Sequence, residues 1–445
     1  MASDLLSIAA SGARTARIAL DVTAQNIANA STDGYVRRTV QLEEVASTGS
    51  FGRIGDVSLS GVRLDRVVRN ADLFRQAEVR RTGADAARAN AEVAGLENIE
   101  TALEQTGVYP AIVNFEASLQ QLAADPLDPS LRAAVIEDAR TMTRTFNVAS
   151  SSLDAVGEGL RFEASDDVAQ VNLLAEELSR VNLRLARASD ASSDQTVLLD
   201  QRDSLLQQLS DHVDVHTTIA ADQTVEVRIG SSGGAQLVAN GTSYPLAMQT
   251  AGDGTISFTL DGNPLSPLSG SLVGRSQALG KLADMKVDLD TIAADLIATV
   301  NGIQTGGVAL DGSAGQPLLT GTNAGDIALA FNDGALLATA PAGAGPNSRD
   351  PDNLVALRDA LSSSNPAGRM DALLFDISST VQGRAVTRDT INSIASTAKI
   401  ALQAQAGVDL DHEAVNLIRF QQAFQASGRV MQVASDIIDT LLGIR

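Results

Sequence analysis

Residues 23–38 read TAQNIANASTDGYVRR, and this stretch decides how the chain begins. Two amides, Asn26 and Asn29, stand about one turn apart beside Ile27, and no catalytic group accompanies them. Asn is a mediocre helix former, but an amide beside a packed seam can set the register of paired helices. The following letters STDGY predict the end of the helix, because Gly34, which precedes Tyr35, suits a positive φ. An ordinary helix end is the alternative interpretation of this stretch alone.

The two ends of the chain share a heptad pattern. In the first segment, apolar residues fall every seven positions with alanines between them: Leu6, Ala13, Leu20 and Ile27, interleaved with Ala9, Ala16 and Ala30. The last segment repeats the pattern with Leu410, Leu417, Phe424, Met431 and Ile438, interleaved with Ala414, Gln421, Gly428, Ser435 and Leu442. Narrow seams with this spacing are typical of coiled coils. We therefore expect the first and last helices to pair, with small side chains allowing close approach.

The composition excludes several classes of protein. The chain has 445 residues and a net charge of −21, which argues against binding to nucleic acid, where phosphate neutralisation dominates. It has no Cys, hence no disulfide, no thiolate zinc site and no thiol nucleophile. No apolar run approaches a membrane span, and the N-terminus lacks the pattern of a secretory signal peptide. Arg outnumbers Lys thirty to three, which indicates either fork-shaped partners for carboxylates or a codon bias.

The periodicity changes along the chain and predicts a mainly α fold with an inserted β domain. Helical spacing runs from 72 to about 211, with breaks expected at Pro110, Pro126, Pro129, Gly157 and Gly159. Short alternating runs separated by Gly-rich turns follow, which is the pattern of β-hairpins. We expect a terminal coiled-coil assembly domain (1–71 and 405–445), a helical bundle body (72–212, 275–303 and 350–404), a small outer β-rich domain (213–274) and a short irregular or β insertion (304–349).

Two sequence patterns carry possible chemistry. The letters GSSGG at 230–234 match the nucleophile elbow G-x-S-x-G, but that motif requires a helix after the turn, and a second strand is expected here. The run DHVDVH places His212, Asp214 and His216 on one face if it is extended, yet solvated turn residues are the favoured interpretation. We therefore predict no catalytic residue, no cofactor and no metal site, and expect that the protein is not an enzyme.

Both termini resemble the axial proteins of the bacterial flagellum. The stretch LDVTAQNIANASTDGYVRR is similar to their rod, hook and hook-associated signature, in which an N-I-A-N helix end precedes a T-x-G-Y turn. The stretch from 407, GVDLDHEAVNLIRFQQAFQASGRVMQVASDIIDTLLGIR, is similar to their C-terminal helix. The helical segments VLLDQRDSLLQQLSDHVDV and GSLVGRSQALGKLADMKVDLDTIAADLIATVNGIQ resemble the hook-associated protein 1 family, which forms the junction between hook and filament. Another axial protein, a hook or rod component, is the alternative, and it would require β structure at 90–210.

The resemblance implies a structural role in the flagellum. It implies export through the flagellar type III apparatus without a cleaved signal peptide, and a location outside the cell at the hook–filament junction. The implied partners are further copies of the chain in a ring, hook protein, hook-associated protein 3, and an export chaperone at the C-terminal helix. The segment 304–350 is short compared with the family's large outer insertion, so no role of that insertion is expected here.

The seams are too thin to order the terminal helices by themselves. A large buried apolar side chain contributes about 1.5–3 kcal/mol, whereas ordering the backbone costs about 1–2 kcal/mol per residue. We therefore expect residues 1–30 and 405–445 to be largely unordered in the monomer and to fold when neighbouring copies cover them. The expected assembly interface comprises Leu6, Ala9, Ala13, Ala16, Leu20, Asn26, Ile27, Asn29, Gly34, Tyr35, Leu417, Phe424, Met431, Ile438 and Leu442.

Overall fold

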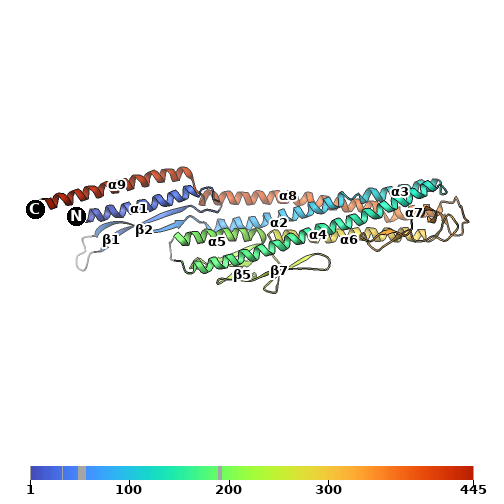
Figure 1. Ribbon diagram of the computed structural model, residues 1–445, viewed down its shortest axis with the longest axis horizontal. Helices are drawn as coiled ribbons and strands as arrows, with labels where there is room; N and C mark the ends of the chain where they lie inside the picture. Colours follow the sequence, from blue (N-terminus) through green and yellow to red (C-terminus); the bar gives the residue numbers. More distant parts are fainter. Residues whose placement is uncertain (1, 33, 49–56, 189–192, 444–445) are drawn as a thin grey trace. The chain divides into compact units, whose positions relative to one another are not determined.

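The computed structural model describes residues 2–32, 34–48, 57–188 and 193–443, with side chains for all of these except 2–4, 46–48, 57–60, 193 and 441–443. The fold is mainly helical, as predicted (Figure 1). Its helices are α1 (Ala2–Ala28), α2 (Leu73–Glu104), α3 (Val108–Ala124), α4 (Pro129–Leu185), α5 (Ser193–His212), α6 (Ser271–Gln304), α7 (Asp352–Ser364), α8 (Pro366–Ala406) and α9 (Leu410–Gly443), with a short 3-10 turn η1 (Gly334–Leu336).

The strands form small antiparallel sheets. One is a hairpin of β1 (Arg38–Thr48) and β2 (Val57–Arg69). The predicted β segment forms a four-stranded sheet of β3 (Val215–Ile219), β4 (Val225–Ile229), β5 (Gln236–Ala239) and β6 (Thr242–Ser243), and a three-stranded sheet of β7 (Leu246–Thr250), β8 (Ile256–Leu260) and β9 (Asn263–Leu265). In the later insertion, β10 (Gly307–Val308) pairs with β13 (Ala340–Pro341), and β11 (Leu319–Thr320) pairs with β12 (Ala328–Leu329).

The chain divides into two compact units. The first unit contains Met1–Ala84, Val171–Pro245 and Asn392–Arg445, and the second contains Asp85–Gln170 and Leu246–Ile391. The divisions fall inside α2, α4 and α8, and the two larger sheets belong to different units. These units are defined by contacts, whereas the domain limits predicted from the sequence follow changes of periodicity, and those limits stay a prediction.

In the first unit, α1 and α9 pair in antiparallel fashion, so that both ends of the chain lie together (Figure 1). Two contacts define one register. The Asn26 amide reaches Glu413, and a side chain on Gly12 would come within 3.0 Å of Ser427 Oγ. Moving fourteen residues toward the N-terminus on α1 therefore moves fourteen toward the C-terminus on α9. The predicted pairing of the terminal helices is confirmed.

A β-hairpin covers a second side of α1, and the sequence analysis missed it. The hairpin begins ten residues after α1 ends and packs against that helix. At Gly61, where φ is +103°, a Cβ would lie 2.2 Å from Ser11 Oγ, and the amide of Val62 donates a hydrogen bond to that hydroxyl over 3.2 Å. The segment 1–71, expected to belong to the terminal coiled-coil domain, therefore also contains strands at 38–48 and 57–69, which were not predicted.

The helix α4 runs without a break through Gly157 and Gly159, so the breaks predicted there are wrong. Glycine weakens an isolated helix, but α4 is held by packing in the second unit, where the site of a Cβ on Gly157 lies 2.9 Å from Leu282 Cδ2 of α6. The contact of α2 with α6 needs glycine for a different reason. A Cβ on Gly274 would lie 2.2 Å from the carbonyl oxygen of Arg88, so only a bare backbone fits there.

A helical glycine with open space at its Cβ site and a glycine in contact with a neighbouring backbone predict opposite effects of substitution by alanine. Nothing lies within 4 Å of the Cβ site on Gly159, so Gly159→Ala should raise the free energy of unfolding by about 0.5–1 kcal/mol through helix propensity. Gly274→Ala should lower it by about 1–3 kcal/mol, because the added methyl group collides with the α2 backbone. Thermal unfolding followed by circular dichroism measures both. Equal effects of the two substitutions would contradict the described helix contacts.

Candidate assembly interface

The predicted interface residues of α1 lie along the face that packs inside the first unit. Ala9, Ala13 and Ala16 are buried, and Leu6, Leu20 and Ile27 are half-buried. The structure adds buried residues that the heptad count did not include, among them Ala19 and Val22. This wider burial follows from the hairpin, because α1 packs against two partners and not against α9 alone.

On α9 the first predicted row faces inward except at Leu410, which is 53% exposed, and Phe424, and the second row is displaced by one residue. Leu417, Met431 and Ile438 are half-buried, while Phe424 is 43% exposed. The residues between them that face inward are Glu413, Phe420, Ser427 and Ala434, one position before the predicted Ala414, Gln421, Gly428 and Ser435. Ala414, Gln421 and Ser435 are exposed, so their place in the seam was predicted wrongly. The side chain of Leu442 lies outside the described residues.

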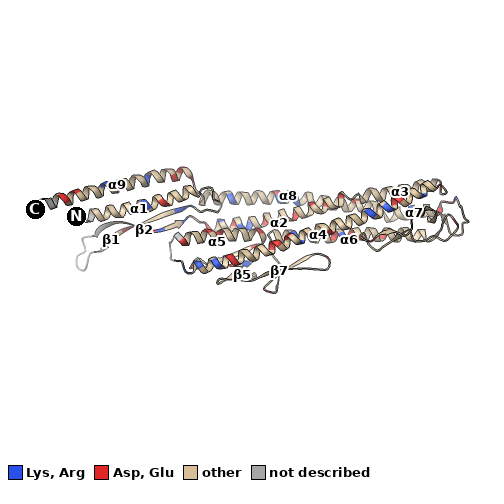
Figure 2. Cartoon of the chain, in the orientation of Figure 1, with Lys and Arg blue, Asp and Glu red and all other residues tan. Residues whose placement is uncertain are grey.

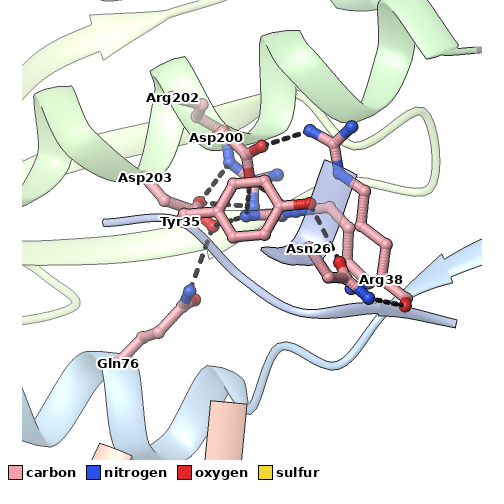
Figure 3. Close-up of polar contacts among 8 residues, drawn as sticks. Asn26, Tyr35, Arg38, Gln76, Asp200, Arg202 and Asp203 are labelled. Atoms are coloured by element: carbon pink, nitrogen blue, oxygen red, sulfur yellow. Dashed lines mark hydrogen bonds and ion pairs between the residues drawn. The ribbon is translucent and has the colours of Figure 1, made fainter. Parts of the chain in front are cut away.

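The side chain of Asn26 is the polar centre of this unit (Figure 3). It is 1% exposed, and it binds both backbone groups of one residue: Nδ2 donates to Arg38 O over 2.8 Å, and Arg38 N donates to Oδ1 over 3.0 Å. Its second N–H donates to Glu413 Oε2 over 3.2 Å, and the Tyr35 hydroxyl donates to Oδ1 over 2.9 Å. The amide therefore uses its full hydrogen-bonding capacity to join α1, the start of β1 and α9.

The other predicted residues of the signature have more local roles. Asn29 donates to the Gln25 carbonyl over 2.9 Å and accepts from the Thr32 hydroxyl over 3.4 Å, both within the same helix end. Gly34 adopts φ +76° at the turn, as its neighbourhood predicts, and this turn brings Tyr35 back to Asn26. Of the two amides, Asn26 connects segments and Asn29 finishes a helix.

A chain of Arg–Asp pairs ties the hairpin to α5 (Figure 3). Arg38, at the start of β1, binds Asp200 over 2.6 Å and stacks on the Tyr35 ring at 5.2 Å from its centroid. Arg69, at the end of β2, binds Asp200 over 2.7 Å and Asp203 over 2.9 Å, and its side chain is only 6% exposed. Gln76 and Arg202 complete the bonding of Asp203. Both ends of the hairpin are thus fastened to one face of α5.

The surroundings of this cluster shift two pKa values. Burial opposes ionisation of Asp203, but Arg202 and Arg69 outweigh it, so the pKa of this carboxyl is lowered. Burial raises the pKa of the Tyr35 hydroxyl, with Asp200 and Glu413 adding to the shift and Arg38 opposing it. Asp203 is therefore a carboxylate at neutral pH, and it holds its arginine partners as charged pairs.

Sequence reasoning missed Glu413 and the arginine–aspartate cluster. Glu413 is 1% exposed and binds Arg37 Nε over 2.7 Å, although as a charged residue outside both predicted rows it was expected at the surface. The one signal for the cluster was the excess of Arg over Lys, because guanidinium groups form directional, bidentate pairs with carboxylates. Nothing local in the sequence links 38 and 69 to 200 and 203.

The outward face of α9 carries exposed Val and Ile side chains that no described residue covers. Val415, Ile418, Val430, Val433 and Ile437 fall within about one third of the helix circumference, opposite the row that packs on α1, and each is 41–65% exposed. Between 414 and 435, α9 carries two charged residues, Arg419 and Arg429, which are exposed and fall within the same third of the circumference (Figure 2). Exposed Val and Ile side chains opposite the packed row are typical of a helix that is covered on both sides, and the aliphatic stems of the two arginines can lie along such a surface.

The remaining sequence candidates do not form a site. The letters GSSGG join β4 to β5 in a hairpin, so the helix that a nucleophile elbow requires is replaced by a strand. Among the described residues, His, Asp and Glu gather nowhere in a group of three suited to a metal ion. None of the described helices is long and apolar enough to cross a bilayer.

Both ends of the chain match known protein families. Residues 6–35 match the flagella basal body rod protein family, and residues 403–444 match the C-terminal family of the flagellar basal body rod FlgEFG proteins. Paired terminal helices with these signatures define an axial structural protein of the bacterial flagellum. Residues 93–319, half of the chain, match the helical domain of flagellar hook-associated protein FlgK. The chain belongs to this family, and the flagellar structural function predicted from the sequence is confirmed.

Individual relatives agree. The chain is 26% identical to flagellar hook-associated protein 1 of Bacillus subtilis, across 95% of this chain and 94% of the relative. It is 24% identical to the protein of that name in Escherichia coli K12, across the whole of both chains. The solved structure of the flagellar hook junction protein FlgK from Burkholderia pseudomallei has the same fold over 55% of this chain and 46% of that one, with a TM-score of 0.50 and 22% identity. Residues 90–210 are almost entirely helical, so the hook or rod alternative is not supported.

The hydrogen bonds of Asn26 predict a specific weakness. Asn26→Ala leaves Glu413 and the buried backbone of Arg38 short of partners, at a cost of about 1–3 kcal/mol for each group. Amide exchange of the purified subunit should show faster exchange at residues 36–38 and 410–416, while α3 and α6 are unchanged. Asn29→Ala is the matched control and should leave these rates as in the wild type. Equal exchange in both variants would contradict the central role of Asn26.

The lowered pKa of Asp203 predicts a dependence on pH. Because the folded-state pKa lies below the unfolded value, the stabilisation is present above about pH 4 and is lost as the pH falls through the folded-state pKa. Asp203→Asn should therefore lower the urea midpoint at pH 7, with a loss of about 3 kcal/mol in the free energy of unfolding. It should also reduce the further loss of stability on acidification. Glu43→Gln, which removes an exposed pair with Arg63, should change neither. Parallel pH profiles for Asp203→Asn and the wild type would refute this assignment.

Proposed function

We propose that this chain forms the ring of subunits that joins the flagellar hook to the filament, and that it assembles through α1 and α9. The observation that carries the proposal is the uncovered apolar face of α9. Burial of each of its Val and Ile side chains contributes up to about 1.5–3 kcal/mol, which is available only when neighbouring copies cover the helix. Family membership supports the location, and the names of the relatives support the junction role.

The partners follow from that place in the flagellum. Hook protein lies on one side of the ring and hook-associated protein 3 on the other, and a chaperone covers the C-terminal helix before export. Export through the flagellar type III apparatus brings the subunit outside the cell. An uncovered apolar helix gives a physical reason for a chaperone, since exposed patches of this kind promote premature association. The protein acts by position and contact, and no catalytic step is part of the proposal.

The order of the terminal helices should be graded in the free subunit. At one end of the pair, Asn26, Arg37 and Glu413 form buried polar bonds, whereas at the open end Val430, Val433 and Ile437 of α9 remain exposed. We therefore expect order near Asn26 to persist and order toward both chain ends to increase on assembly. From the sequence, residues 1–30 and 405–445 were expected to be largely unordered in the monomer. We now expect this for the parts of both segments that lie away from Asn26, and it stays a prediction.

A charge on the outer face of α9 tests the proposal. Val433→Asp should abolish incorporation at hook ends, because a carboxylate at a covered position loses its hydration, while the subunit itself stays folded since Val433 is 57% exposed. Val287→Asp, at a valine of α6 that is 63% exposed, is the matched control and should be incorporated normally. Immunoblots of purified hook–basal bodies and swimming assays give the readout. Normal junctions with Val433→Asp would refute assembly through this face.

A further inference from the structure

An aromatic side chain protrudes from α8 in the second unit. Phe375 is 73% exposed and points away from the buried row of Met370, Leu373 and Ile377 on the same helix. Its neighbours on the outer face are small, with Ala372, Ser378 and Ser379 within one turn, and Asp371 stands one turn before it. Asp371 is exposed and has no ion-pair partner among the described side chains. The outer face of α8 thus presents a phenyl ring beside a free carboxylate.

The same unit has an open pocket between the end of α2 and α4, with a polar rim and two apolar residues, Ala102 and Val148. It has a volume of about 470 Å³ and is lined by Ala102 of α2, by Gln105 and Thr106 of the turn that follows it, and by Thr141, Arg144, Thr145, Val148 and Ser152 of α4. Val148 is 52% exposed, and Arg144 stands one turn before it, exposed and without an ion-pair partner among the described residues. A phenyl ring is small compared with this volume and can lie against Ala102 and Val148, with the polar residues around its edge.

The two features lie at the same height along the bundle. The helices α8 and α2 run in opposite directions (Figure 1) and are joined by Arg384–Glu92 at 3.1 Å; Arg388 also reaches Glu97, at 3.7 Å. Counting back from these pairs along α8 brings Phe375 level with the last turns of α2, where the cavity lies. Phe162 is equally exposed, at 76%, but it lies fourteen residues from Val148 on α4, about 21 Å along the helix. Only Phe375 therefore matches the height of the cavity.

We infer that Phe375 of one subunit inserts into the α2–α4 cavity of the next subunit in the ring, and that Asp371 pairs there with Arg144. A contact between two different patches is heterologous, and such contacts close into rings when the rotation permits. Patches at equal height suit copies related by rotation about an axis along the helices. The inference rests on the proposed ring and adds a second contact, outside the terminal helices, that fixes the spacing of the bodies.

The absence of cysteine from the chain makes a cross-linking test clean. The double variant Arg144→Cys/Asp371→Cys, expressed in a strain that lacks its own copy, should give a ladder of dimers, trimers and higher species on non-reducing gels of mildly oxidised hook–filament junctions. Either single variant should remain monomeric, because its two equivalent positions do not meet in a heterologous contact. Monomer alone from junctions that did assemble would overturn this inference and leave the proposed function standing. Failure of the wild type to join hook ends would instead overturn the proposed function.

Substitutions at the same residues give an independent readout. Phe375→Ala should lower incorporation at hook ends by about 30-fold, the loss expected for truncation of an aromatic hot spot, whereas Phe162→Ala should have no effect. Arg144→Asp and Asp371→Arg should each lower incorporation by about tenfold, and the double variant Arg144→Asp/Asp371→Arg should recover most of it. Circular dichroism confirms that each variant is folded. Double-variant incorporation no better than that of the single variants would show that these two residues do not meet.

Discussion

The terminal unit depends on one buried amide. Asn26 binds the N–H and the C=O of Arg38 as a neighbouring strand would, and its remaining N–H reaches Glu413 on the last helix. Removal of the Asn26 amide strongly destabilises the unit, because each buried polar group left unpaired costs more than a typical hydrogen bond contributes. The same side chain fixes where β1 begins and how α1 aligns with α9. The signature around residue 26 therefore connects two segments that lie almost four hundred residues apart in the sequence.

The hairpin connects α1 and the Asn26 site to α5 in the first unit. It covers one side of α1, and its two ends carry Arg38 and Arg69, which share Asp200 on α5. Guanidinium groups suit this role, since their fixed fork holds two carboxylates in defined directions and stays charged at any physiological pH. The charges of Arg38 and Arg69 are used here within the subunit, against the carboxylates of Asp200 and Asp203. Of the two explanations for the excess of Arg, these contacts favour the structural one.

Repeating patterns in the sequence predicted several elements, whereas contacts between residues far apart in the sequence were not predicted. Heptads at both ends predicted the pairing of α1 with α9, and the change of period predicted the sheets between 215 and 265. The second row on α9 was displaced because seam partners can follow by three or four residues, and the true row contains Glu413 and Ser427, which are not apolar. The hairpin was missed because its strands mix charged and apolar residues. Gly157 was taken as a break because propensity acts locally, whereas α6 supports that turn of α4 from outside it.

The unequal cover of the two terminal helices gives assembly a direction. The helix α1 packs on α9 and on the hairpin, and its free side carries Arg14, Arg17 and Asp21, all exposed and well hydrated. The helix α9 has one covered side, and its other side carries five exposed Val and Ile side chains beside Arg419 and Arg429 and faces no other described residue. Burial of apolar area is non-directional in itself, so direction must come from charged surface that resists burial elsewhere. Because hydration keeps the free side of α1 in water, incoming copies gain most by covering α9, and the subunit joins its neighbours through the helix that is least complete alone.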